Sequence, residues 1–320
     1  MPILTAAATA FVFPGQGSQT VGMGRELAQA SPAARQAFAE ADDALGFALS
    51  TLCWDGPDAD LNATVNTQPA LLACSIAALR ALREKIGGFE PAFYAGHSVG
   101  EITALVAAGA LSFANGLRLV RARGRAMAAA GERSPGGMAA ILGLDASGLE
   151  AVCAEASALA GGVVQVANDN CPGQVVISGD VAPLEKAMEL AKAKGAKRAM
   201  RVAVSVAAHS PLMQSGLADY EAAVAAVPVQ APRRPVISNI TAEPLPDVAA
   251  IRAELPAQLI TQVRWTDSVR YLVAHGVTTF LELGSKDVLT GLLKRIDANT
   301  TGLAVGAPAA LDQIEVSPPA

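Results

Sequence analysis

The chain has 320 residues, of which 52% are hydrophobic and 4% aromatic, and it carries a formal net charge of −5. This length can bury one large domain or two smaller ones, no apolar run approaches the roughly 20 residues of a membrane-spanning helix, and the acidic balance argues against broad nucleic-acid binding. The first basic residue is Arg25, which does not fit the charged start of a signal peptide. The four cysteines are scattered without a CxxC pair, as expected of reduced thiols: Cys53, Cys74, Cys153 and Cys171. We therefore expect a cytoplasmic protein that binds neither membranes nor nucleic acids.

A glycine-rich loop follows the first predicted strand. The apolar residues 11–13 predict a buried strand that runs into loop 14–19. Thr20 stands where a dinucleotide-binding GxGxxG motif requires its third glycine, so that fingerprint fails. The loop either presents backbone N–H groups to an oxyanion or phosphate, or forms a simple tight turn. Helices are then expected over 22–48, interrupted at Ser31-Pro32, and from about 66 to 83 with Pro69 in the first turn.

The segment 93–101 is the most informative part of the chain. It places Gly96-x-Ser98-x-Gly100 between an apolar run typical of a strand and an Ala/Leu-rich run typical of a helix. The glycines permit a sharp turn that pushes the Ser98 hydroxyl into a cleft, with the positive end of the helix behind it. The alternative is a glycine-rich turn whose serine caps the helix.

Arg123 lies in the apolar stripe of the next predicted helix, which runs from the N-cap Ser112 to about residue 130. Its neighbours three and four positions away are all apolar: Leu119, Val120, Ala126 and Met127. Arg118, Arg121 and Arg125 share a different face, as a solvated basic surface does. A buried arginine needs a partner for its planar fork, which is either an internal carboxylate or the carboxylate of a ligand.

Residues 134–204 predict a small subdomain. After a linker at 134–137, strands are expected at 138–144, 163–168, 174–178 and 197–204, with helices at 147–160 and 181–194. This βαββαβ order is that of a ferredoxin-like unit, inserted between residues 1–133 and 205–310 of a larger subdomain. In the second segment we expect a helix from Ser210-Pro211 to 226, a strand at 234–238, helices at 248–261 and 265–275, a strand at 278–283 and a helix at 286–296. Residues 311–320 are expected to form a loose tail.

The three histidines can be compared as candidate bases for Ser98. His97 is adjacent to Ser98 and is expected to point away and support the turn, and His275 precedes Gly276, where capping of a helix end is favoured. His209 lies in a loop after the small subdomain and is the remaining candidate, although it could simply bond to the backbone at a helix start. No acidic residue lies between 202 and 217, so a carbonyl group could orient the imidazole instead. No His/Cys/Asp cluster has the spacing of a metal site.

Several motifs together resemble malonyl-CoA:acyl carrier protein transacylases. They are FPGQGSQ at 13–19, TQPA at 67–70, GHSVGE at 96–101, VRW at 263–265 and VLTGL at 288–292, with Arg123 and His209. The resemblance covers nearly the whole chain. It implies an α/β fold in which an α/β-hydrolase-like large subdomain carries an inserted ferredoxin-like (βαββαβ) small subdomain.

The resemblance also implies roles for six residues. Ser98 is the nucleophile and His209 its general base and acid, while Arg123 grips the malonyl carboxylate. The backbone supplies the rest: N–H groups of Gln16 and Val99 form the oxyanion hole, and the carbonyl of Gln258 orients the histidine. Two departures from relatives are Ala207-Ala208, which implies a roomier acyl pocket that excludes methylmalonyl groups less firmly, and Gly284-Ser285-Lys286, where only a local turn effect is expected.

The implied reaction transfers a malonyl group from coenzyme A to the phosphopantetheine thiol of acyl carrier protein through a malonyl-serine, supplying fatty acid synthesis. It needs no permanently bound cofactor, and the protein is expected to be a monomer that meets its acidic carrier protein transiently. The densest basic cluster is a candidate docking surface or a solvated face: Lys192, Lys194, Lys197, Arg198 and Arg201. The alternatives are a malonyl or methylmalonyl transferase serving a polyketide synthase or a malonate decarboxylase, a serine acyl hydrolase, and a non-catalytic docking protein.

Overall fold

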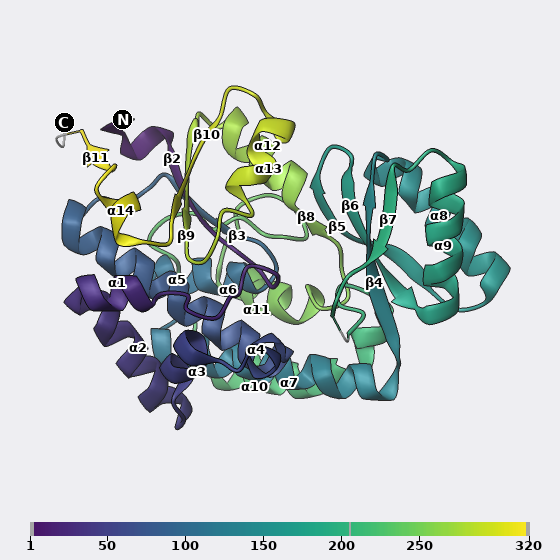
Figure 1. The fold of residues 1–320 in the computed structure, drawn as a ribbon, viewed down its shortest axis with the longest axis horizontal. Helices are drawn as coiled ribbons and strands as arrows, with labels where there is room; N and C mark the ends of the chain where they lie inside the picture. The colour runs from purple at the N-terminus through teal and green to yellow at the C-terminus, as the bar shows by residue number, and fades with distance from the viewer. Residues whose placement is uncertain (1–2, 205, 318–320) are drawn as a thin grey trace.

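A computed structural model describes residues 3–204 and 206–317. These residues form a four-stranded parallel sheet, a five-stranded mixed sheet and a two-stranded pair at the chain ends. Figure 1 shows the two larger sheets in separate parts of the molecule, each with its own helices. None of the described helices is long and apolar enough to cross a membrane.

The four-stranded sheet has the order β10-β9-β2-β3, and all its strands are parallel. Its strands are β2 (Thr9–Phe13), β3 (Phe93–Gly96), β9 (Thr279–Leu283) and β10 (Thr301–Val305). Every residue of β2 is buried, as expected of a parallel sheet covered on both faces. Phe13 pairs with Gly96, so β2 and β3 end side by side. The loop 14–19 and the turn at Ser98 therefore lie next to each other at the carboxyl edge of the sheet, where α/β folds place their ligands.

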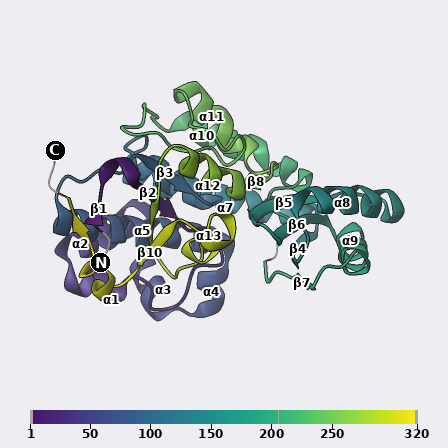
Figure 2. The same cartoon turned by 90° about the horizontal axis from the view of Figure 1, so that it is seen from above.

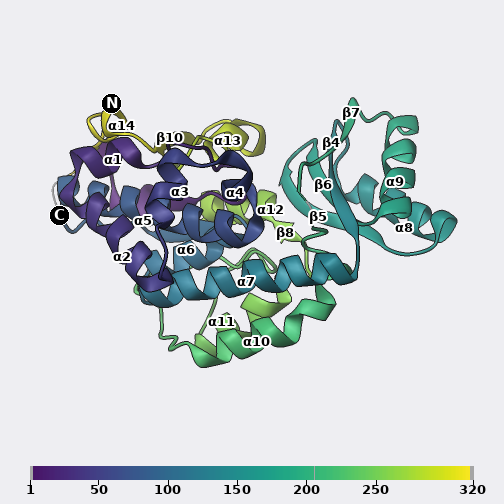
Figure 3. The ribbon, with the colours of Figure 1, turned by 60° about the horizontal axis from the view of Figure 1, so that its bottom comes forward.

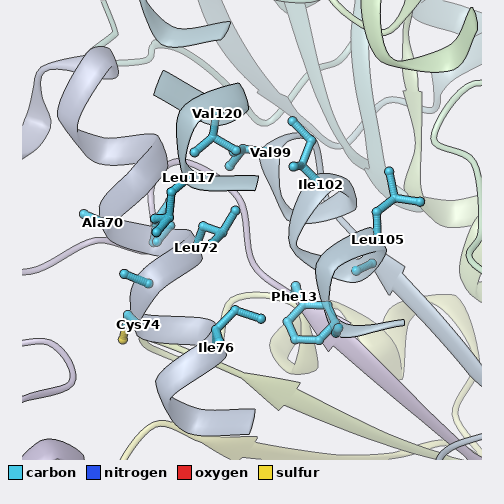
Figure 4. Close-up of a cluster of buried hydrophobic side chains, with 14 of the residues drawn as sticks. Phe13, Ala70, Leu72, Cys74, Ile76, Val99, Ile102, Leu105, Leu117 and Val120 are labelled. Atoms are coloured by element: carbon cyan, nitrogen blue, oxygen red, sulfur yellow. The ribbon is translucent and has the colours of Figure 1, made fainter. Parts of the chain in front are cut away.

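Helices α5 (Thr64–Ile86), α6 (Val99–Ala107) and α7 (Phe113–Arg133) enclose the large core. Figure 4 shows Leu72 and Ile76 of α5 facing Ile102 of α6, Leu117 of α7 and Phe13 of β2. Ser112 caps α7 as predicted, because its side chain accepts a hydrogen bond from the Asn115 N–H. In Figure 3, α7 passes between the amino-terminal helices and the pair α10 (Leu217–Ala226) and α11 (Val248–Ala257). The amino-terminal helices are α1 (Arg25–Ala30), α2 (Pro32–Leu45), α3 (Leu49–Asp55) and α4 (Asp58–Asn62).

The second sheet has the order β7-β4-β6-β5-β8. Residues 136–201 supply β4 (Gly136–Leu142), α8 (Ala146–Ala160), β5 (Val164–Cys171), β6 (Gln174–Asp180), α9 (Val181–Ala193) and β7 (Arg198–Arg201). Apolar residues from the sheet and both helices form a separate core, and Figure 2 shows α8 and α9 at the end of the molecule. The fifth strand, β8 (Val263–Arg264), comes from the later chain and pairs parallel with Asn168 and Asp169 of β5. It joins the second sheet to the rest of the molecule.

A short 3-10 helix, η1 (Ala6–Ala8), precedes β2, and further helical elements follow residue 210. They are η2 (Pro211–Gly216), α12 (Trp265–Ala274), α13 (Thr290–Ile296) and α14 (Pro308–Leu311). The sequence did not predict α3, α4, β8 or β10, which are short or lack clear periodicity. Residues 315–316 form β11 (Glu315–Val316), which pairs with β1 (Ile3–Leu4), so the expected loose tail is wrong at these positions. Residues 318–320 of that tail lie outside the described residues.

Three further expectations about secondary structure need correction. α5 begins at Thr64, so Pro69 lies beyond the first turn, where its missing N–H removes one helical hydrogen bond. The segment 234–238 makes only isolated bridges, Val236 with Tyr94 and Ile237 with Pro244, instead of a strand. The linker expected at 134–137 is shorter, because β4 already begins at Gly136.

Candidate active site

Ser98 occupies a strained turn between β3 and α6. Its backbone has φ 53° and ψ −115°, a conformation that non-glycine residues rarely adopt. A Cβ atom on Gly96 would lie 1.9 Å from the Gly100 carbonyl oxygen, and one on Gly100 would lie 2.2 Å from the Phe13 carbonyl oxygen. Both flanking positions therefore require glycine. The Ser98 side chain makes no capping hydrogen bond to α6, so the capping alternative is wrong and the hydroxyl is available for other contacts.

His209 lies against Ser98. Its Nε2 atom is 2.8 Å from the Ser98 Oγ atom. On the other side of the ring, Nδ1 lies 2.8 Å from the Gln258 carbonyl oxygen and 3.2 Å from that of Thr261. Since carbonyl oxygens only accept, Nδ1 carries the proton and Nε2 is left as the acceptor for the serine hydroxyl. The carbonyl of Thr261 was not anticipated from the sequence.

The imidazole of His209 is kept neutral by its surroundings. The residue is 2% exposed. Burial, with the nearby charge of Arg123 adding to it, lowers the pKa of His209 from 6.5 to about 3. The ring is therefore uncharged around neutral pH and can accept a proton.

Arg123 is 1% exposed and holds the other side of the serine. Its Nη2 atom donates to Ser98 Oγ at 3.2 Å and to Gln258 Oε1 at 2.9 Å, while Nη1 donates to Gln68 Oε1 at 3.1 Å. Within the described residues Arg123 forms no ion pair, and its Nε atom has no partner. Of the two alternatives that the sequence left open for Arg123, the internal carboxylate partner is therefore wrong. Neutral amide oxygens hold a guanidinium whose charge is left uncompensated.

Two residues expected to supply backbone N–H groups line the same cavity as Ser98. They are Gln16 in the loop after β2 and Val99 at the start of α6. In the described part of the chain neither N–H donates to a protein acceptor. The His97 N–H donates to the Phe13 carbonyl at 3.0 Å, which ties the two loops together. Lys286, in the turn where the sequence departs from relatives, has φ 63° and donates from Nζ to the Gly17 carbonyl, so that turn contacts the loop 14–19.

The cavity has a volume of about 170 Å³ and lies between the two larger sheets. Its walls are largely apolar, with Met127 of α7, Met138 and Val176 of the second sheet, and Ala208 beside His209. Asn168 and Asn170 of β5 add amide groups. This lining suits a small acyl group with polar atoms near the serine.

A buried polar network lies behind the serine. The Ser98 N–H donates to Asn239 Oδ1 at 2.7 Å, and Asn239 Nδ2 donates to the Gly96 carbonyl at 2.7 Å. Gln258 Nε2 donates to Glu101 Oε2 at 2.5 Å. The side chains of Gln68, Asn239, Gln258 and Glu101 were not assigned these positions from the sequence. The one usable signal was Asn239, a polar residue just after the strand predicted at 234–238.

The other two histidines lie where they were expected. His97 Nε2 is 2.8 Å from Asn170 Oδ1, and its ring packs edge-on against Trp265, so it supports the turn. Burial lowers the pKa of His97. His275 is the C-cap of α12, where Nδ1 bonds the Tyr271 carbonyl at 2.8 Å. No group of three or more His, Cys, Asp or Glu side chains suited to a metal ion occurs among residues 3–204 and 206–317.

Comparisons with known proteins bear on the whole chain. The model of the acyl transferase domain matches residues 10–304. The malonyl CoA-acyl carrier protein transacylase of Bacillus subtilis is 46% identical over 303 residues, which is 95% of each chain. The solved acyl-carrier-protein S-malonyltransferase of Burkholderia pseudomallei is 48% identical with a TM-score of 0.91, covering 95% of this chain and 98% of its own. A malonyl-transacylase solved in complex with a type II PKS acyl-carrier protein is 43% identical with a TM-score of 0.91, covering 95% and 97%.

Proposed function

The chain belongs to the acyl transferase family, and from this membership and its site we propose that it transfers a malonyl group from coenzyme A to the phosphopantetheine thiol of an acyl carrier protein. The observation that carries the proposal is the placement of Ser98 Oγ between a neutral imidazole at 2.8 Å and an unpaired guanidinium at 3.2 Å. The imidazole suits a base that activates the hydroxyl, and the guanidinium suits the free carboxylate of a malonyl group.

In the first half-reaction, Ser98 Oγ attacks the thioester carbonyl while its proton passes to His209 Nε2. The carbonyl oxygen becomes an oxyanion, which the N–H groups of Gln16 and Val99 stabilise; losing one such donor typically costs about 3 kcal/mol of barrier. The carbon–sulfur bond then breaks, and the coenzyme A sulfur leaves with the proton from His209. The product is malonyl-Ser98.

The second half-reaction runs in reverse with a different thiol. The phosphopantetheine thiol gives its proton to His209 and attacks the ester carbonyl, and Ser98 leaves with that proton. The carbonyls of Gln258 and Thr261 stabilise the imidazolium that forms in each half and keep the ring in place. No resident cofactor or metal is needed in this scheme.

Arg123 selects the acyl group by its charge. Among the described residues its two Nη atoms contact only neutral oxygens, and a malonyl carboxylate at this position would gain charge-assisted hydrogen bonds. A neutral acyl chain would instead leave the buried cation without a counter-charge. This argues against a general serine esterase.

We interpret the architecture as an α/β-hydrolase-like subdomain, residues 1–133 and 205–310, carrying a ferredoxin-like subdomain at 134–204. The order β7-β4-β6-β5 supports the second part of this interpretation, since it follows the 4-1-3-2 arrangement of a βαββαβ unit. A cytoplasmic location is part of the proposal, and its support is that Cys53, Cys74, Cys153 and Cys171 are free and buried. We also propose a monomer.

The carrier protein is proposed to be acidic and to dock transiently on the basic cluster at 192–201. All five basic side chains of the cluster are exposed. Two of them are already paired, Lys194 with Glu155 and Arg201 with Glu185. Lys192, Lys197 and Arg198 are therefore the better candidates for contacts to the carrier. Charge reversal at Lys197 and Arg198 should raise the KM for the carrier and leave the loading of Ser98 by malonyl-CoA unchanged.

The test is the mass of the intact protein after incubation with malonyl-CoA. We expect one malonyl adduct on Ser98, its absence in Ser98→Ala, and its transfer to phosphopantetheinylated carrier protein. A docking protein without catalysis would give no adduct. Rapid release of free malonate with no acylation of the carrier would show a hydrolase instead.

The pathway served by the transfer is proposed to be fatty acid synthesis. A transferase serving a polyketide synthase is the alternative with a specific observation in its favour, because one similar structure is named as a malonyl-transacylase with a type II PKS acyl-carrier protein. A comparison of carrier proteins from the two pathways as acceptors, read as kcat/KM, would separate them.

A further inference from the structure

Two buried carboxyl groups lie behind the active site and have no part in the scheme above. Glu101, on α6, is fully buried, and Glu254, on α11, is 7% exposed. They meet at one loop: the Asn239 N–H donates to Glu101 Oε2 at 3.2 Å, and the next N–H, of Ile240, donates to Glu254 Oε1 at 3.1 Å. Two carboxylates cannot both be ionised at such close quarters in a buried site.

The hydrogen bonds indicate which group carries the shared proton. Glu254 Oε1 accepts from Ser238 Oγ at 2.7 Å as well as from Ile240 N–H, as a carboxylate does. Glu101 Oε1 is buried and has no hydrogen-bond partner among the described residues, and the Glu254 carboxyl is close enough to Glu101 for a hydrogen bond between the two side chains. A proton on Glu101 Oε1, donated to Glu254, satisfies both groups.

The pKa shifts of the two carboxyl groups agree with placing the shared proton on Glu101. Burial, with the charge of Glu254 adding to it, raises the pKa of Glu101 well above its ordinary value. Burial also raises the pKa of Glu254. Hydrogen bonds oppose the rise at both groups, from Ser238, Ile240 and Glu101 at Glu254 and from Gln258 and Asn239 at Glu101, and only at Glu101 does the rise take the pKa well above the ordinary value.

One residue, Gln258, connects Glu101 to Arg123. Gln258 Nε2 donates to Glu101, and Gln258 Oε1 accepts from Arg123 Nη2 at 2.9 Å. An ionised Glu101 would therefore place a negative charge one side chain away from the guanidinium. A protonated Glu101 leaves that guanidinium surrounded by neutral groups.

We propose that Glu254 holds the proton of the pair on Glu101, and that this makes Glu254 a specificity-determining residue, because it keeps a negative charge away from Arg123. The inference rests on the proposed function. Glu254 acts through Glu101 and Gln258 and touches no reacting atom. The guanidinium thereby keeps its charge for the carboxylate of the acyl group.

The experiment uses two isosteric substitutions with opposite expectations. Glu254→Gln keeps an oxygen for Ser238 and Ile240 but offers an N–H to Glu101, which then ionises beside Gln258. We expect kcat/KM for malonyl-CoA to fall by about tenfold, mainly through KM, with acetyl-CoA changed by less than about threefold. Glu101→Gln mimics the protonated acid, donates to Glu254, and should change both substrates by less than about twofold.

The double variant Glu101→Gln/Glu254→Gln is the decisive control. It has no carboxylic acid left to ionise, so we expect malonyl transfer to return to within about threefold of wild type. A merely structural role for Glu254 predicts no such recovery, and it predicts equal losses with malonyl-CoA and acetyl-CoA.

Several outcomes would overturn the inference. A malonyl-specific loss in Glu101→Gln with none in Glu254→Gln would place the proton on Glu254. Full activity in Glu254→Gln would remove its role, and failure of the double variant to recover would do the same. If Glu254→Gln does not fold, Glu101→Gln decides alone, because selective loss of malonyl transfer there contradicts a protonated Glu101. Malonyl loading of the wild-type protein is measured first, so its absence would count against the proposed function and not against this inference.

Discussion

His209 Nε2 lies 2.8 Å from Ser98 Oγ although 111 residues separate the two in the chain. Both residues have positive φ angles, 57° for His209 and 53° for Ser98, so the contact joins two strained backbone positions. Strain of this kind persists only where the surroundings fix it. Here the flanking glycines fix the serine, and the carbonyls of Gln258 and Thr261 fix the imidazole.

Replacing Arg123 with alanine should change which acyl group is transferred. The variant loses the charge-assisted hydrogen bonds to a malonyl carboxylate, so we expect kcat/KM for malonyl-CoA to fall by about a hundredfold or more. Acetyl transfer should improve relative to malonyl transfer. Arg125→Ala is the matched control, because Arg125 is exposed on the same helix. Unchanged malonyl kinetics in Arg123→Ala would contradict the carboxylate contact.

The pH dependence of acylation should reflect the buried imidazole. His209 works in its neutral form, and a pKa of about 3 keeps it neutral throughout the useful range. We therefore expect kcat/KM for malonyl-CoA to stay flat from pH 8 down to about 5. In Arg123→Ala, measured with acetyl-CoA against wild type, the acidic limb should move to higher pH, because the charge of Arg123 contributes to the depression of the pKa. A wild-type limb near pH 6.5 would contradict the lowered pKa of His209.

Replacing Gly100, two residues after Ser98, should destabilise the fold. A Cβ on Gly100 would lie 2.2 Å from the Phe13 carbonyl oxygen, so Gly100→Ala forces β2 and α6 apart. We expect it to lower the free energy of unfolding by about 3 kcal/mol or more, measured by urea denaturation. Gly291→Ala is the matched control: nothing lies within 4 Å of its Cβ in α13, and removing a helical glycine should stabilise by up to about 1 kcal/mol. Equal effects in the two variants would show that the close contact does not matter.

Ala208 should set how well the pocket tolerates a branched acyl group. It lines the cavity beside His209, and its small side chain leaves space for an extra methyl group. Ala208→Leu should therefore reduce loading by methylmalonyl-CoA at least about tenfold more than loading by malonyl-CoA, in a competition read as the Ser98 adduct. Ala203→Leu is the control, since Ala203 is exposed in the same segment. A wild-type protein that rejects methylmalonyl-CoA outright would show that the pocket is not roomier.

The sequence was sufficient for residues whose role depends on their immediate neighbours. Ser98 could be found because its turn needs two glycines within five residues, and Arg123 because a cation in an apolar stripe is conspicuous. Ser112 as a helix cap and most elements of 136–201 could be predicted for the same reason. Periodicity and capping are local, and no distant contact overrides them here.

The polar network behind the serine could not be predicted in this way. Gln258 contacts Glu101 across 157 residues and Arg123 across 135, and nothing near Gln258 in the chain distinguishes it from a helix-end glutamine. Family resemblance supplied its backbone carbonyl but not its side chain. β8 and β10 were not predicted for a related reason. Each is a strand chiefly because it pairs with a neighbouring strand, and β8 has only two residues.

The pairing of β5 with β8 affects how large substrates can reach Ser98. Gln165 of β5 donates to the carbonyls of His209 and Ile260, at 2.8 and 3.2 Å, and β8 begins only three residues after Ile260. The contacts that join the two halves of the molecule here therefore also hold the backbone of His209. Separating β5 from β8 would move the imidazole away from Ser98. The two halves also meet at α13, where Arg295 donates to Gln174 Oε1 and to the Pro172 carbonyl at 2.9 and 2.6 Å. Val202 and Val288 line the same cavity and are 36% and 42% exposed. We therefore expect a long pantetheine arm to enter the cavity past these exposed valines, while the contacts between β5 and the segment before β8 keep His209 in place.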